Sequence, residues 1–176
     1  MSNAIILIDG QNLYYGLKDL SLNEWDINWS SFFKSLLSPD DKLLRTYWFR
    51  PQKILDTFHT PHHIRSTICF KKFNSYSHLY NQDSISVPSH ISSQIEAEAV
   101  IVENWLKEVK EKFSKSEYKY DQISMDYEDI EVVKTGVVKV DPHKQAMIGE
   151  KGVDISLAVK MIALSVQKRC DKIYIG

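Results

Sequence analysis

Runs of apolar residues alternate along this chain with polar and turn-forming stretches. Residues 4–8 (Ala-Ile-Ile-Leu-Ile) contain no polar position, which predicts a short strand buried on both faces. The turn-forming pair Asp9-Gly10 ends this run. Four further segments have the short apolar character of strands: residues 43–49, 64–70, 132–140 (interrupted at Gly136) and 173–175.

Helical periodicity occupies several of the intervals between these runs. Apolar residues recur at spacings of three and four from Ile91 to Phe113, the pattern of an amphipathic helix. Residues 153–168 predict a very apolar helix, a shorter helix is expected to begin near Ser30, and Asn12 is a candidate N-cap. Three stretches lack a clean period, and the first and last of them predict loops: residues 74–90, 118–131 and 141–149.

Strands that alternate with helices imply βαβ units and a mainly parallel, doubly wound sheet. The predicted fold class is therefore α/β. The sequence contains no internal repeat and no linker-like stretch. We therefore expect residues 1–176 to form a single domain with an insertion around residues 74–130.

Composition narrows the class of protein. The chain has 176 residues, of which 43% are hydrophobic and 11% aromatic, which excludes a disordered protein. Its 22 basic and 23 acidic residues give a formal charge of −1, which argues against a wholly electrostatic nucleic-acid binder. Cys69 and Cys170 are far apart and form no CxxC motif, so a reduced, cytoplasmic protein is expected. No apolar run approaches the length of a membrane span, so no membrane partner is expected.

The strongest local candidate for chemistry is Asp9-Gly10-Gln11-Asn12, directly after the first strand. Ligands of parallel sheets bind beyond the carboxyl ends of the strands. A carboxylate at that end, with an amide three residues later, can direct two oxygens into one crevice. Hard divalent cations such as Mg²⁺ prefer such oxygen ligands. Asp9 and Asn12 also have an ordinary structural role, because either side chain could cap the first turn of the next helix.

A second candidate, Gly149-Glu150-Lys151-Gly152-Val153-Asp154, opens the apolar helix. Asp154 would lie at the same edge as Asp9 if the strand before it runs parallel to the first strand. Gly152 permits close backbone approach, and Lys151 can contact a phosphate. An aspartate in a first helical turn is also an ordinary complement to the helix dipole.

Other familiar signatures are missing. The sequence has no GxGxxG, GxxxxGK[ST] or GxSxG, so dinucleotide-binding, P-loop and α/β-hydrolase functions lack their motifs. His59, His62 and His63 form a group, but a polar loop is a better expectation than a metal site because no cysteine or helical HxxxH pair accompanies them. The aromatic residues of segment 47–49, with Arg50, could stack on bases or contact phosphate, although core packing is their default role.

Taken together, residues 4–13 (Ala-Ile-Ile-Leu-Ile-Asp-Gly-Gln-Asn-Leu) and 151–159 (Lys-Gly-Val-Asp-Ile-Ser-Leu-Ala-Val) resemble the NYN domain family of PIN-like nucleases, which includes the bacterial LabA-like proteins. The resemblance covers both ends of the chain, with a divergent middle. It implies a PIN-like three-layer α/β/α fold and a metal-dependent ribonuclease that acts on single-stranded or structured RNA. The implied cofactor is Mg²⁺ or Mn²⁺.

Carried over by position, the resemblance makes Asp9 and Asp154 the metal ligands and catalytic residues, with Asn12 and Lys151 as substrate contacts. A metal held there would neutralise the phosphate and lower the pKa of a bound water. In-line attack by this water would leave a 5′-phosphate and a 3′-hydroxyl.

The sequence departs from the family pattern in two places. Lys160 stands six residues after Asp154, where the family commonly has another aspartate. The last predicted strand runs into Gly176, where the family continues with Ser-Gly-Asp-x-Asp. We therefore expect that the natural protein continues beyond Gly176, and that this chain alone lacks carboxylates that catalysis needs.

Two other functions stay open. A catalytically inactive PIN-like module would bind RNA, a nucleotide or a partner protein without cutting, and Lys160 and the missing acidic motif favour it. A phosphatase is disfavoured because Gln11 stands where an aspartyl-phosphate mechanism would need a second aspartate. Aromatic residues in the middle of the chain leave room for a homo-oligomer interface.

Overall fold

The computed structural model describes residues 1–78 and 87–176, and it divides into two compact units. The sheet unit comprises Met1–Lys53, Lys115–Val138 and Glu150–Gly176. The second unit comprises Ile54–Ser114 and Lys139–Gly149. The prediction of one domain with an insertion stays a prediction.

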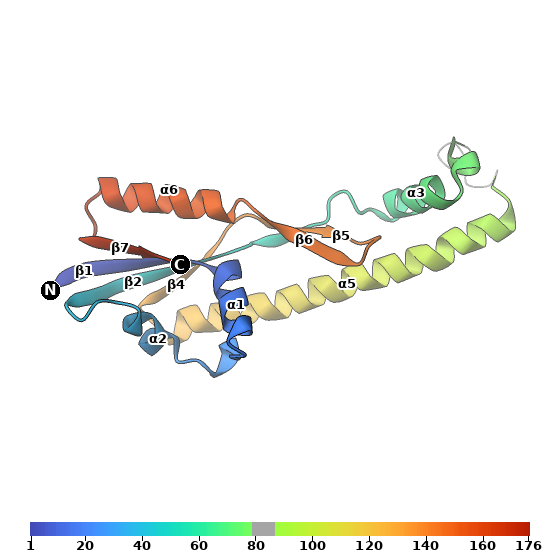
Figure 1. Ribbon diagram of the computed structural model, residues 1–176. Helices are drawn as coiled ribbons and strands as arrows, with labels where there is room; N and C mark the ends of the chain where they lie inside the picture. Colours follow the sequence, from blue (N-terminus) through green and yellow to red (C-terminus); the bar gives the residue numbers. More distant parts are fainter. Residues whose placement is uncertain (79–86) are drawn as a thin grey trace. The chain divides into compact units, whose positions relative to one another are not determined.

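Four parallel strands form the main sheet of the sheet unit. They are β1 (Ser2–Asp9), β2 (Asp41–Arg50), β4 (Ile130–Lys134) and β7 (Lys172–Ile175), in the order β4-β2-β1-β7. The helices of this unit are α1 (Gly10–Asp19), η1 (Glu24–Asp26), α2 (Trp29–Ser35), the end of α5 (Ser89–Asp126) and α6 (Val153–Val166). The predicted α/β class with a mainly parallel sheet is confirmed (Figure 1).

Side chains of β1 alternate between two apolar layers, one on each face of the sheet. Ile6 and Ile8 face a core that contains residues of α1, α2 and the end of α5. Ile5 and Leu7 face a second core beneath α6. Figure 1 shows α6 on one side of the sheet and α2 on the other. The prediction that residues 4–8 form a strand buried on both faces is confirmed.

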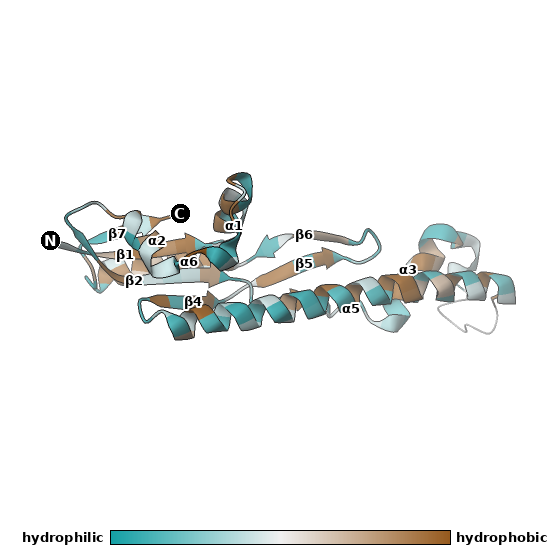
Figure 2. Ribbon diagram, turned by 90° about the horizontal axis from the view of Figure 1, so that it is seen from below, coloured by the Kyte–Doolittle hydropathy of each residue, from teal (hydrophilic) through white to brown (hydrophobic). Residues whose placement is uncertain are grey.

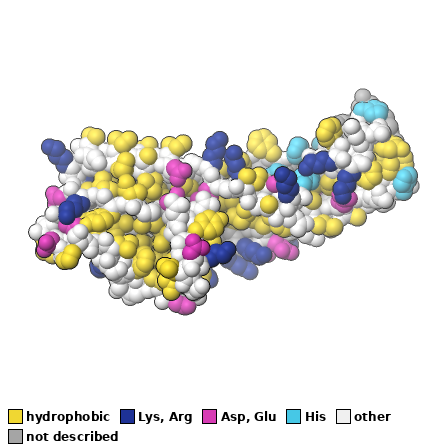
Figure 3. All heavy atoms as spheres, in the orientation of Figure 1, with side chains coloured by type: hydrophobic (Ala, Val, Ile, Leu, Met, Phe, Trp, Pro, Cys, Tyr) yellow, Lys and Arg dark blue, Asp and Glu magenta, His cyan; other side chains and the backbone are white. Residues whose placement is uncertain are grey.

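The helix α6 is apolar on its outer side as well. Its inner residues Val153 and Leu164 are buried. Its outer apolar residues are more than half exposed: Ile155, Val159, Ile162 and Val166. Hydrophobic side chains gather over α6 in the space-filling view (Figure 3). Within the described part of the chain, α6 therefore buries only one of its apolar sides.

A second sheet contains β3 (Lys53–Leu55), β5 (Val137–Asp141) and β6 (Ala146–Lys151), in the order β3-β5-β6. Gly136 has a φ of +69° and separates β4 from β5, at the position where the sequence predicts an interruption. The predicted loop over residues 141–149 is wrong for its second half, which belongs to β6. The turn between β5 and β6 contains no Gly, and Gln145 supplies its positive φ, so the usual hairpin signal is missing.

In the second unit, the predicted strand over residues 64–70 is wrong, because these residues belong to helix α3 (Pro61–Lys72). The N-terminus of α3 has a common capping pattern. The Thr60 side chain accepts a hydrogen bond from the His63 N–H, and Pro61 occupies the first turn. Ile64 and Ile68 are one helical turn apart and pack in an apolar cluster with residues of α5. A short apolar run does not distinguish a buried strand from a helix by its period alone.

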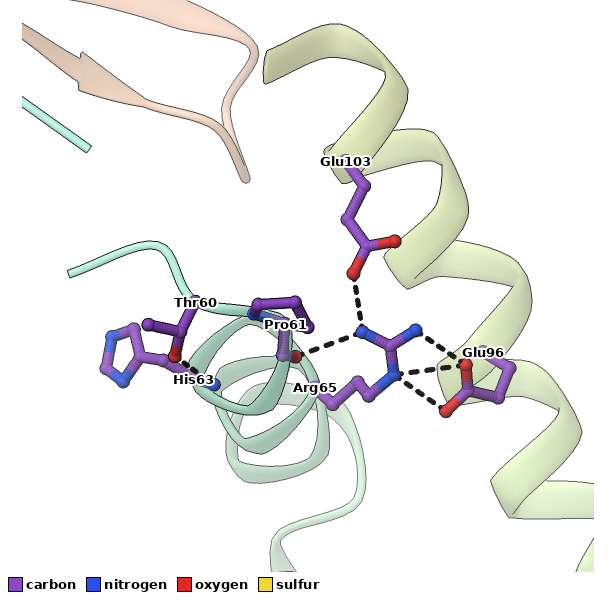
Figure 4. Close-up of polar contacts among 6 residues, drawn as sticks. All are labelled: Thr60, Pro61, His63, Arg65, Glu96 and Glu103. Atoms are coloured by element: carbon purple, nitrogen blue, oxygen red, sulfur yellow. Dashed lines mark hydrogen bonds and ion pairs between the residues drawn. The ribbon is translucent and has the colours of Figure 1, made fainter. Parts of the chain in front are cut away.

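An arginine fork also joins α3 to α5 (Figure 4). The Arg65 Nε atom donates to both carboxylate oxygens of Glu96 at 2.8 and 3.0 Å. The Arg65 Nη1 atom donates to Glu103 and to the Pro61 carbonyl. The contact with Arg65 lowers the pKa of Glu96, so this pair is fully charged at neutral pH.

The long helix α5 confirms the predicted helix from Ile91 to Phe113 and extends it to Asp126. Residues 118–126, where the sequence shows no clear period, are therefore helical. Figure 2 shows both hydrophilic and hydrophobic residues along this helix. In the predicted loop over residues 74–90, Asn74–Tyr76 form the short helix η2, and residues 79–86 lie outside the described part of the chain.

Among the described helices, none is both long and apolar enough to cross a membrane.

Gly10 lets α1 begin immediately after β1. A Cβ atom at this position would lie 2.7 Å from the Phe49 carbonyl oxygen and 2.9 Å from the Trp48 indole nitrogen. Because the nearest atom belongs to the backbone of β2, we expect Gly10→Ala to lower the free energy of unfolding by about 1–3 kcal/mol. Urea unfolding followed by circular dichroism measures this change.

Gly16, in the same helix, provides the matched control. A Cβ atom there meets no other atom within 4 Å. Gly16→Ala should therefore raise the free energy of unfolding by about 0.5–1 kcal/mol, because alanine restricts the unfolded chain and favours the helix. Equal effects of the two substitutions would contradict the close approach of α1 to β2.

Candidate functional site

Asp9 ends β1 and caps α1. Its Oδ1 atom accepts hydrogen bonds from the backbone N–H groups of Gln11 at 2.8 Å and Asn12 at 3.0 Å. The structural role considered for Asp9 is thus confirmed, whereas Asn12 as an N-cap is wrong because Asn12 lies inside the first turn. The Asp9 residue is only 8% exposed, and no described residue donates a hydrogen bond to its Oδ2 atom. One carboxylate oxygen therefore holds the helix while the other stays available.

Asp154 lies in the first turn of α6. The strand before it is β6, which belongs to the three-stranded sheet, so the condition that this strand is part of the parallel main sheet is not met. Gly136, between β4 and β5, and Gly152, between β6 and α6, both have positive φ. A Cβ atom on Gly136 would lie 2.5 Å from the Lys151 carbonyl oxygen, so only glycine permits this approach of β5 to the end of β6.

Glu150 lies near the two predicted aspartates, Asp9 and Asp154. It is the second-last residue of β6, and it is partly buried. Burial raises the pKa of Glu150, the charges of Asp9 and Asp154 raise this pKa further, and the charge of Arg50 lowers it. The structure therefore brings Asp9, Glu150 and Asp154 close enough for their charges to interact. The sequence motif contains Glu150, but its role depends on the pairing of β6, which the sequence pattern does not show.

Arg50 supplies the positive charge of this site. It is the last residue of β2, and its guanidinium lies over the Tyr120 ring, 3.7 Å from the ring centroid. Its Nε and Nη1 atoms are buried and have no hydrogen-bond partner among the described residues. The Tyr120 hydroxyl donates to Glu24 at 2.8 Å, which anchors the ring under the guanidinium. Unpartnered charged donors at a buried site are costly, so they favour an anionic ligand.

The two predicted substrate contacts, Asn12 and Lys151, lie on the same segments as Asp9 and Glu150. Both side chains are exposed. Neither side chain makes a hydrogen bond or ion pair with a described residue of this site. Their roles as substrate contacts stay predictions.

The donor set determines which ions the site can attract. Three carboxylates and one guanidinium give it a formal charge of −2. Among the described residues, no three His, Cys, Asp or Glu side chains are arranged to hold a metal ion by themselves. Mg²⁺ is commonly bound by one or two carboxylates, with waters and substrate phosphates completing its shell. The carboxylates of Asp9 and Asp154, the predicted metal ligands, could supply that weaker kind of binding.

The histidine group of the second unit is arranged differently from the predicted polar loop. His62 and His63 belong to the first turn of α3, and only His59 lies outside it. His143 lies near them, and burial lowers its pKa, with the charge of Lys71 lowering it further. No described group of three such residues could hold a metal here either.

Comparisons of this chain with protein-family models, with curated proteins and with solved structures find no match. The resemblance to the NYN family therefore stays a prediction from the sequence motifs.

The cap at Asp9 yields a prediction that separates its structural role from its charge. Asp9→Ala removes the acceptor for two N–H groups and should lower the free energy of unfolding by about 0.5–2 kcal/mol. Asp9→Asn retains an acceptor oxygen and should cost only a few tenths of a kcal/mol relative to wild type. Urea unfolding of both variants measures the difference, and equal losses would contradict the cap.

The raised pKa of Glu150 predicts a pH-dependent stability. The folded protein holds the Glu150 proton more tightly than the unfolded chain does, so stability falls as pH rises above the ordinary glutamate value of 4.5. Glu150→Gln removes this loss and should therefore stabilise the protein more at pH 7 than at pH 4. Urea unfolding at both pH values measures the gap. Glu128→Gln, at an exposed loop position, is the control and should show no such gap.

Proposed function

We propose that this chain binds RNA phosphodiesters at the edge formed by Asp9, Arg50, Glu150 and Asp154, and that it hydrolyses them with a divalent cation. The observation that carries the proposal is the Arg50 guanidinium, whose buried Nε and Nη1 atoms lack partners among the described residues and lie near three carboxylates. A guanidinium fork matches the geometry of phosphate oxygens. The motifs shared with the NYN family support the same reaction.

The cation would bind to Asp9 and Asp154, the ligands that the resemblance implies, where it would neutralise phosphate charge and lower the pKa of a water. Arg50 would hold a phosphate oxygen through its unpartnered N–H groups. Glu150 is suited to carry a proton, because burial and two neighbouring carboxylates favour its protonated form. It would deliver that proton to the leaving 3′-oxygen, which yields the 3′-hydroxyl and 5′-phosphate ends.

Binding without hydrolysis is the second candidate. It is favoured by the lack, among described residues, of three side chains arranged to hold a metal. Lys160 also favours it, because its ammonium lies 3.8 Å from the centroid of the Tyr47 ring and adds no carboxylate to the edge. In this case the Arg50 donors would bind RNA or a nucleotide, and the cation would be dispensable. A reduced, cytoplasmic location, which the free Cys69 and Cys170 favour, is part of the proposal.

Cleavage of labelled RNA tests hydrolysis. Single-stranded and hairpin RNAs are incubated with the chain in Mg²⁺, Mn²⁺ or EDTA. Cleavage should require the cation, and Asp9→Asn and Glu150→Gln should each slow it about a hundredfold or more. Asp19→Asn, at the exposed end of α1, is the matched carboxylate control and should leave the rate unchanged. Cleavage that persists in EDTA or in Asp9→Asn would refute this mechanism.

Filter binding separates the two candidates when no cleavage is seen. A binding module should retain RNA in EDTA, with an affinity that falls as salt rises. Arg50→Gln should weaken that binding about tenfold, as expected for loss of a charged hydrogen bond to phosphate. Binding that is equal in wild type and Arg50→Gln would rule out this edge as the RNA site in both candidates.

A further inference from the structure

A cavity lies in the sheet unit, on the face of the sheet that α6 covers. Its volume is about 430 Å³, within the range of small-molecule sites. Ile5, Leu44 and Leu164 line its apolar part, and the Tyr47 ring forms one wall. The cavity is lined by residues of β1, β2 and α6 and by Arg169 after α6, and α6 contacts both strands. It does not include Asp9, Arg50, Glu150 or Asp154, so it is distinct from the edge that these four residues form, which we call the acidic edge.

The charged side chains of this cavity are all basic. Arg45 comes from β2, Lys160 from α6 and Arg169 from the turn after α6. No acidic residue is among the described residues that line the cavity. Three cations from three segments of the chain therefore meet around one apolar floor.

The cations are not equally compensated. The Arg45 Nη1 atom lies 3.1 Å from a carboxylate oxygen of Glu131, and both side chains are nearly half exposed. The Lys160 ammonium lies on the Tyr47 ring, and the Arg169 Nε atom donates to the Gln167 side chain at 3.3 Å. Neither Lys160 nor Arg169 forms an ion pair with a described residue. Two positive charges therefore lack a counter-charge at this cavity.

We propose that this cavity binds a nucleoside 5′-monophosphate group, either as a free nucleotide or as the 5′-phosphorylated end of an RNA. A phosphate monoester carries a charge of about −1.5 to −2 at neutral pH, which matches the two uncompensated cations. A carboxylate or an internal phosphodiester carries only one negative charge. The fork of Arg169 matches phosphate geometry, and the apolar floor beside Tyr47 accepts the flat face of a base. This inference does not depend on hydrolysis at the acidic edge.

Isothermal titration with 5′-AMP tests the proposal. AMP should bind the wild-type chain, whereas adenosine and inorganic phosphate should bind at least about tenfold more weakly, since each lacks one half of the ligand. Lys160→Gln and Arg169→Gln should each weaken AMP binding about tenfold, as for the loss of one charged contact. Lys42→Gln, at an exposed position of β2 outside the cavity, is the matched control and should leave the affinity unchanged.

Two further arms identify the source of the ligand and the site. Tighter binding of 5′-phosphorylated RNA than of 5′-hydroxyl RNA, lost in Arg169→Gln, would assign the RNA end as the ligand. AMP binding that is lost in Arg50→Gln but retained in Lys160→Gln and Arg169→Gln would overturn the proposal, because AMP would then occupy the acidic edge. Equal affinities for AMP and adenosine would overturn it as well. Circular dichroism and thermal unfolding establish that each variant is folded.

Discussion

The arrangement of carboxylates at the edge of the sheet depends on the positive charge of Arg50. Asp9 ends β1, Glu150 lies in β6 and Asp154 lies in α6, and the charges of the two aspartates raise the pKa of Glu150. Arg50 is the group that acts on Glu150 in the opposite direction. A guanidinium keeps its charge across the whole physiological pH range, so this compensation is constant. Burial and the charges of Asp9 and Asp154 raise the pKa of Glu150, and the charge of Arg50 works against them.

Close backbone contacts place these charges, and glycine makes each contact possible. Gly10 brings α1 against the end of β2, next to Arg50. Gly136 brings the start of β5 against the end of β6, next to Glu150. In both places a Cβ atom would meet a carbonyl oxygen at less than 3 Å. The geometry of the edge thus depends on the absence of a Cβ atom at Gly10 and Gly136, although neither residue has a functional side chain.

Much of the fold can be predicted from the sequence, because its buried strands have an unambiguous apolar pattern. Residues 4–8 and 43–49 become the two central strands, and the end of β1 locates Asp9 correctly. The site is less predictable. Glu150 reaches it through β6, whose pairing depends on positive φ at Gln145 and Gly136 rather than on a period. Arg50 is visible only as one member of an aromatic segment, since its isolation from partners is a property of the folded chain.

The helix α3, which the sequence pattern wrongly predicts as a strand over residues 64–70, also shows that hydropathy alone does not determine the structure of a short segment. Residues 64–70 begin and end with apolar side chains and have three polar residues between them, and the pattern that separates helix from strand needs a longer window. Thr60 and Pro61 carry the decisive local signal, because a threonine cap followed by proline in the first turn starts helices and not strands. Capping chemistry is therefore a better guide than hydropathy for short segments of this chain.

Lys160 connects the two sites that the sheet unit presents. It stands six residues after Asp154 on α6, about 9 Å further along the helix axis. The side chain at this position lies on the face of the Tyr47 ring, which is electron-rich. A carboxylate there would be repelled by the ring, whereas an ammonium is attracted to it. The lysine is therefore better understood as part of a basic cavity than as a lost metal ligand. One helix thus carries an acidic group at its start and a basic group at its middle, and it contributes a side chain to each of the two sites.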